Sequence, residues 1–171
     1  MLSDEELVAA LNKKEMAPAG HLDMLDRART DLQLISPRPF QMMHSQKPGR
    51  LVHWFCEETN TVIHRQVQLM PQKFFAVAGL PQVAGERIES VFPELERVHK
   101  LGFKGVLLNP DPYENSGVEA PGLGDRYWYP LYEKLCEFDM PAHVHATGSH
   151  SDRTPYTLHF INEETIAVYN L

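Results

Sequence analysis

A nearly continuous apolar run at positions 74–80, ended by Pro81, is the feature that most constrains how this chain folds. A run of this kind is typical of a β-strand that is covered on both faces. Shorter strand-like runs at 32–35, 105–109 and 142–146 alternate with helical patterns at 51–69, 85–101 and 129–138. This alternation predicts an α/β fold in which about four parallel strands are joined by right-handed crossover helices.

Further helices are predicted at both ends of the chain. Ser3 and Glu6 have the spacing of a capping box, which predicts a helix that runs to about Lys14. A second helix is predicted at 21–29, and Asn162 is expected to cap a last one. Pro93 lies inside the predicted helix at 85–101, where a proline is expected to introduce a kink.

Composition excludes several classes of protein. The 171 residues suit a single domain, and their formal net charge of −7 argues against nucleic acid or an anionic membrane surface as a partner. The first eleven residues are acidic, unlike a signal peptide, and no apolar run approaches the length of a membrane span. Cys56 and Cys136 are expected to be reduced, mostly buried thiols. We therefore expect a cytoplasmic protein.

Chemistry in parallel α/β folds gathers beyond the carboxyl ends of the strands. That rule selects four segments here: 36–40, 81–82, 109–113 and 145–150. At the start of the last one, His145 stands two residues after His143 on a predicted strand, so their imidazoles point to the same side. Two such imidazoles suit a divalent metal, but hydrogen-bonded core histidines would show the same spacing.

Arg38 and Asn109 are the other candidates at the strand ends. Arg38 stands between two prolines, where a fixed guanidinium suits a substrate carboxylate; an ordinary surface arginine is the alternative. Asn109 and Asp111 alternate with prolines, which would hold an amide and a carboxylate in place; a turn whose polar side chains cap local amides is the alternative. The aromatic residues at 127–129 are expected to anchor a crossover helix.

Several of these segments together resemble the amidohydrolase-related family, in particular its 4-oxalomesaconate hydratase branch. The resemblance rests on the motifs at 34–38 (LISPR), 102–105 (GFKG), 108–112 (LNPDP), 125–134 (DRYWYPLYEK) and 141–145 (PAHVH), and it covers nearly the whole chain. It implies a distorted TIM barrel that binds one divalent metal ion, commonly zinc. His145 then matches the family's fifth-strand metal ligand, whereas His143 falls where relatives carry an apolar residue.

The same resemblance implies that residues 1–171 are a single partial barrel domain, truncated at both ends, that holds family strands two to five. The expected function is that of a fragment of a metal-dependent enzyme that hydrates, hydrolyses or decarboxylates a small carboxylated intermediate of aromatic catabolism. Arg38 and Asn109 would bind this substrate, and the metal site would be incomplete. The alternative is an inactive half-barrel that acts only through self-association, because open sheet edges pair with other chains. A homo-oligomer is expected in either case.

Overall fold

The computed structural model describes residues 3–13, 19–38, 42–113 and 120–145. The described elements are α1 (Asp4–Leu11), α2 (His21–Arg27), β1 (Gln33–Ile35), α3 (Arg50–Leu69), β2 (Phe74–Ala76), β3 (Ala78–Gly79), α4 (Phe92–Lys100), β4 (Val106–Leu108), α5 (Tyr129–Glu137) and β5 (Ala142–Val144). Short 3-10 turns at Ile88–Val91 and Arg126–Trp128 lead into α4 and α5. The helix predicted from Asn162 lies outside the described residues.

All described strand pairings are parallel, as the sequence predicts. β1 pairs with β2, and β3, β4 and β5 form a second sheet in that order. The apolar run at 74–80 is divided between the two sheets, because the chain changes partner at Val77. The Val77 N–H donates to the Ile35 carbonyl at 2.9 Å, whereas the Ala78 N–H donates to the Gly105 carbonyl at 2.9 Å. One predicted strand is therefore two short strands that link neighbouring sheets.

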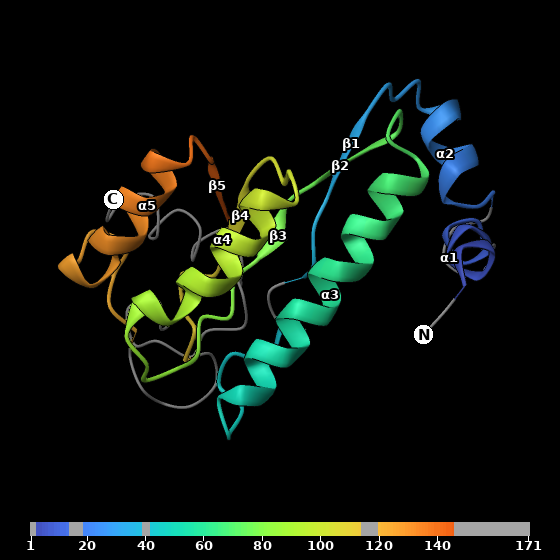
Figure 1. Cartoon of the computed structure of the whole chain (residues 1–171). Coiled ribbons are helices and arrows are strands. Elements are labelled where there is room, and N and C mark those ends of the chain that lie inside the picture. The colour runs from blue at the N-terminus through green and yellow to red at the C-terminus, as the bar shows by residue number, and fades with distance from the viewer. Residues whose placement is uncertain (1–2, 14–18, 39–41, 114–119, 146–171) are drawn as a thin grey trace, which may run out of the picture.

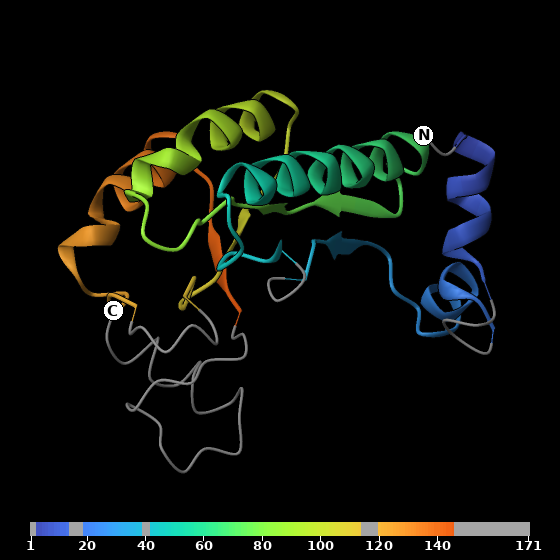
Figure 2. The same cartoon turned by 90° about the horizontal axis from the view of Figure 1, so that it is seen from below.

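The crossover helices α3, α4 and α5 lie on one side of the strands (Figures 1 and 2). The core between these layers consists of apolar side chains from both, and Leu95, Val106, Trp128 and Leu131 are completely buried in it. On the opposite side of the sheet, the register partners Leu34 and Phe75 are 60% and 39% exposed. None of the described helices covers that face of β1 and β2 (Figure 2).

The first two helices are stabilised by local signals and by α3. The Glu6 N–H donates to Ser3 Oγ at 3.2 Å and the Ser3 N–H donates to Glu6 Oε2 at 2.7 Å, which confirms the predicted capping box. Arg65 of α3 forms an ion pair with Asp4 at 2.6 Å. Leu22 and Leu25 of α2 pack in a cluster with Val67 and Leu69 of α3, and α1 and α2 lie at one end of the molecule, beside the C-terminal part of α3 (Figure 1).

Two predictions are wrong in detail. The α-helix predicted at 85–101 begins only at Phe92, and Pro93 lies in its first turn, so it causes no kink. A proline is tolerated there because the first N–H groups of a helix have no partner within the helix. Cys56 is buried as predicted, but Cys136 is exposed because α5 turns Leu131 and Leu135 toward the core. In the described part of the chain, no helix is long and apolar enough to cross a membrane.

Candidate functional site at the carboxyl ends of the strands

Four polar side chains are buried where the strands end: His44, Gln82, Asn109 and Asp111, which we call the rim cluster. Their exposed fractions are 2%, 2%, 0% and 9%. His44 comes from the loop after β1, Gln82 from the loop after β3, and the other two from the loop after β4. Buried polar groups cost free energy unless they are hydrogen-bonded. Four such side chains at one end of the strands therefore indicate that the structure or the function of this region requires them.

The side chain of Gln82 holds the backbone of Asn109 in the manner of a neighbouring strand. Gln82 Nε2 donates to the Asn109 carbonyl at 2.8 Å, and the Asn109 N–H donates to Gln82 Oε1 at 2.9 Å. Both backbone groups follow directly after β4 in a residue with no exposed surface, and buried backbone groups need hydrogen-bond partners. The amide of Gln82 therefore extends the parallel pairing by one position and fixes the point at which Asn109 leaves the sheet.

The Asn109 side chain connects this clamp to two other members of the rim cluster. Its Oδ1 accepts a hydrogen bond from the Asp111 N–H at 2.9 Å, and its Nδ2 lies 2.5 Å from His44 Nδ1. Asp111 Oδ1 in turn accepts from the Tyr113 N–H at 3.0 Å. Asn109 and Asp111 thus cap local amides, which was the structural alternative for this proline-rich segment, while Asn109 also contacts an imidazole from a distant loop.

His44 is the member of the rim cluster that the sequence did not indicate. It lies four residues beyond the strand-end segment at 36–40, in a loop without a recognisable motif. Burial lowers the pKa of its imidazole from 6.5 to about 4, although the nearby Leu80 carbonyl opposes this shift, so the ring is neutral near pH 7. Its Nε2 is the one buried side-chain nitrogen or oxygen in the described residues without a hydrogen-bond partner.

The three side chains predicted from the sequence have different environments. Asn109 is fully buried, His145 is half-buried, and Arg38 is exposed directly after the buried Pro37. The His145 N–H donates to the Leu108 carbonyl at 3.0 Å, which places His145 at the same sheet end as Asn109. The exposed His143 pairs in register with Leu107, and its ring centroid lies 6.2 Å from that of His145. None of these positions tests the predicted ligand roles.

The described residues do not by themselves complete a metal centre. No three His, Cys, Asp or Glu side chains among them lie close enough to share an ion. Catalytic zinc usually takes three protein ligands and keeps a fourth position for water or substrate. His145 can therefore supply at most part of such a site.

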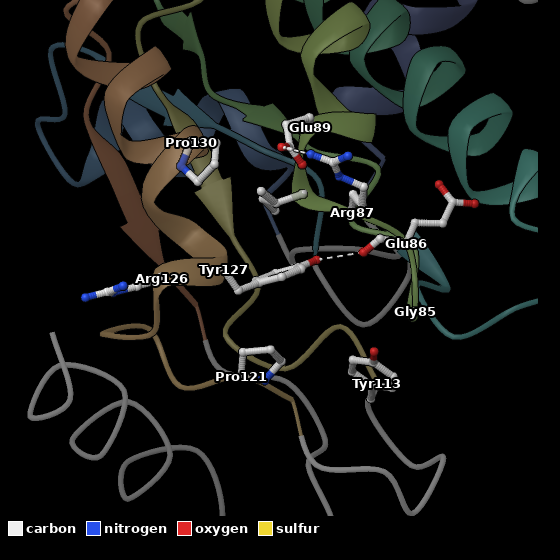
Figure 3. Close-up of a pocket in the computed structure, with 10 residues that line it drawn as sticks. Gly85, Glu86, Arg87, Glu89, Tyr113, Pro121, Arg126, Tyr127 and Pro130 are labelled. Carbon is white, nitrogen blue, oxygen red and sulfur yellow. Dashed lines mark hydrogen bonds and ion pairs between the residues drawn. The ribbon is translucent and has the colours of Figure 1, made fainter.

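A separate cavity of about 410 Å³ opens between the loop at 85–89 and the start of α5 (Figure 3). The Tyr127 hydroxyl donates to the Glu86 carbonyl at 3.1 Å across it, and Arg87 pairs with Glu89 at 2.7 Å. Arg126 points away from Tyr127 (Figure 3). The neighbouring Trp128 is fully buried in the core and anchors α5 as predicted, whereas Tyr129 is 49% exposed and does not. The charged side chains of this cavity are exposed or already paired, so the rim cluster remains the stronger candidate site.

The sequence and fold match known proteins over almost the whole chain. The sequence model of the Amidohydrolase family matches residues 10–169. The chain is 36% identical to 2-keto-4-carboxy-3-hexenedioate hydratase of Sphingobium sp. (strain NBRC 103272 / SYK-6), over 99% of this chain and 48% of that protein. The crystal structure of 4-oxalomesaconate hydratase from Rhodopseudomonas palustris matches with a TM-score of 0.78 and 30% identity, over 99% of this chain and 45% of that one.

A third match is more distant and concerns the fold. The dihydroxybenzoic acid decarboxylase of Polaromonas sp. JS666, with bound manganese and an inhibitor, has a TM-score of 0.66 and 21% identity, over 78% of this chain and 39% of that one. The chain thus spans about half the length of the relatives that it matches. The match to the family covers most of the sequence and agrees with the parallel strands and outer helices, so this chain belongs to the amidohydrolase family.

Proposed function

We propose that this chain supplies part of a metal-dependent enzyme that acts on a small carboxylated intermediate of aromatic catabolism. The family match over residues 10–169 carries this proposal, and the two hydratase relatives favour hydration over decarboxylation or hydrolysis. The location of the rim cluster supports it, because barrel enzymes place their active sites at the carboxyl ends of the strands. The parallel strands, with helices on one side, would form one sector of such a barrel.

Three side chains are proposed to contribute to this site. His145 would supply one ligand to the divalent ion, zinc by our expectation, although the relative from Polaromonas binds manganese. Arg38 would bind a substrate carboxylate through its guanidinium group. Asn109, which is held by Gln82, would orient the loop that faces the substrate. The bound ion would supply Lewis acidity and an acidified water molecule.

A second candidate function is association without catalysis. The exposed Leu34 and Phe75 lie on the uncovered face of β1 and β2. β1 and β5 lie at the outer edges of the described sheets, where unpaired backbone groups favour pairing with another chain. This arrangement would drive an inactive half-barrel to form homo-oligomers.

Metal content of the purified chain distinguishes the two candidates. Close to one zinc or manganese ion per chain, lost in His145→Ala, would support the enzymatic candidate. His143→Ala is the matched control, because His143 lies on the same strand but is exposed and is not expected to bind the metal. A metal-free wild-type chain that elutes as an oligomer would contradict the enzymatic proposal and favour association. Equal loss of metal in both variants would contradict the assignment to His145 alone.

A further inference from the structure

The outer face of α3 carries apolar side chains where a helix facing solvent is usually polar. Trp54, Leu51 and Val62 are 60%, 46% and 39% exposed, although the opposite face of the same helix is buried in the core. No other described helix lies over the outer side of α3 (Figure 1). Tryptophan is on average largely buried in folded proteins, so a group of apolar side chains around an exposed one indicates a surface that a partner covers.

Two opposite charges flank the exposed tryptophan at equal distances along the helix. Arg50 stands four residues before Trp54 and Glu58 four residues after it, so the three side chains form one row along the helix surface, which we call the outer row. Both charged residues are exposed, and neither side chain has an ion-pair or hydrogen-bond partner among the described residues.

Arg50 and Glu58 cannot neutralise each other within one chain. Eight residues of α-helix span about 12 Å, and side chains on a helix reach one another when they are three or four residues apart. The outer row therefore presents a positive charge, a large aromatic ring and a negative charge in sequence, and all three are available to another molecule.

This arrangement is complementary to itself. A twofold interface brings the same patch of two identical chains together, so each patch must match its own reverse. When two copies of α3 lie antiparallel with the twofold axis at Trp54, position 50 of each copy faces position 58 of the other. A parallel arrangement would instead place Arg50 against Arg50 and Glu58 against Glu58, which like-charge repulsion disfavours.

We propose that a second copy of this chain binds to the outer row of α3 in the antiparallel arrangement. The two Trp54 rings meet at the axis, two Arg50–Glu58 ion pairs flank them, and Leu51 adds apolar area beside the row. Tryptophan and arginine are the residues most often found at the centre of strong interfaces. An interface built on one pair of helices is smaller than the standard size, so we expect a dissociation constant in the micromolar range.

This inference does not depend on the proposed function. The outer face of α3 points away from the strands, whereas the rim cluster lies at their carboxyl ends (Figures 1 and 2). It also differs from association through the uncovered face of β1 and β2, because α3 lies on the other side of those strands. Dimerisation through α3 is therefore compatible with an active enzyme as well as with an inactive half-barrel.

Charge reversal tests the pairing directly, with the dissociation constant of the full chain measured by sedimentation equilibrium. Arg50→Glu and Glu58→Arg each place two like-charge contacts in the interface, so each should raise the dissociation constant by about tenfold or more. The double variant should restore it to within about threefold of the wild-type value. This rescue requires contact between two chains, because the two positions are too far apart within one. Circular dichroism checks that each variant is folded.

A pair of variants with matched exposure locates the interface. Trp54 and Leu34 are both 60% exposed, but Leu34 lies on the uncovered face of the strands. Trp54→Ala should raise the dissociation constant by at least about tenfold, whereas Leu34→Ala should change it by less than about threefold. A monomeric wild-type chain, a double charge reversal that fails to restore the dimer, or a dimer lost only in Leu34→Ala would overturn the inference.

Tryptophan fluorescence gives a second readout at the same position. The chain contains two tryptophans, and Trp128 is completely buried, so quenching by acrylamide reports mainly on Trp54. We expect quenching to decrease as the concentration of wild-type protein rises, and to stay constant in Arg50→Glu. Constant quenching in a wild-type chain that does dimerise would place the interface elsewhere and contradict the proposal.

Discussion

Substitution of Gln82 by Met would remove the clamp on the Asn109 backbone while nearly preserving the length of the side chain. The wild-type amide makes two hydrogen bonds, to the Asn109 N–H and to its carbonyl. Both groups belong to a residue with no exposed surface, so water cannot replace the lost partner. The variant therefore loses both of these hydrogen bonds from buried backbone groups next to His44.

The expected loss of stability follows from these two groups. A buried donor or acceptor left without a partner costs about 1–3 kcal/mol, which gives about 2–6 kcal/mol for the pair. The more apolar methionine side chain recovers about 1 kcal/mol on burial. We therefore expect the free energy of unfolding to fall by about 3 kcal/mol, which corresponds to a decrease in Tm of about 6–12 °C for a chain of this size.

The measurement is urea denaturation followed by far-UV circular dichroism, with Tm from a thermal scan. Gln68→Met is the matched control, because Gln68 lies on α3 with an exposed side chain. This control should change the free energy of unfolding by less than about 0.5 kcal/mol. A loss below about 1 kcal/mol in Gln82→Met, close to that of the control, would refute the idea that the clamp satisfies buried backbone groups.

Three further predictions concern ion pairing, backbone strain and pH. Arg97→Met removes the ion pair of the buried Glu94 carboxylate, which among the described residues keeps only its hydrogen bond from Asn60, and should lower the free energy of unfolding by about 3 kcal/mol. The equivalent change at Arg87, which is 88% exposed, should lower it by less than about 1 kcal/mol in urea denaturation. Met43→Gly should raise the free energy of unfolding by about 1 kcal/mol, because glycine adopts the positive φ of this position without strain. Met24→Gly inside α2 should lower it by about as much. A higher Tm for Met24→Gly than for Met43→Gly would contradict this prediction. Because burial lowers the pKa of His44 to about 4, the unfolded chain gains a proton first as the pH falls. In denaturation experiments, the free energy of unfolding of the wild-type chain should then fall by up to about 3 kcal/mol between pH 6.5 and pH 4. His44→Gln should not show this fall, and an equal fall in that variant would exclude His44 as its source.

The sequence alone predicted the parallel α/β class, the crossover helices and the family. These features follow from patterns that repeat within one segment, such as the apolar run at 74–80 and the helical spacing at 129–138. The rule that chemistry gathers at strand ends also selected the segments that contain Gln82 and Asn109. Local patterns carry this information because strand and helix periodicity reflects which face of each element is buried.

Only the tertiary structure decided how the rim cluster is assembled. His44 and Asn109 are 65 positions apart, and nothing in the loop that carries His44 indicates that it folds back over the sheet end. The contact of His44 with Asn109, the clamp by Gln82 and the division of one apolar run between two sheets all depend on which distant groups lie nearby. A sequence pattern shows which residues are buried, but the hydrogen-bond partner of a buried polar group is set by the packing of segments that are far apart along the chain.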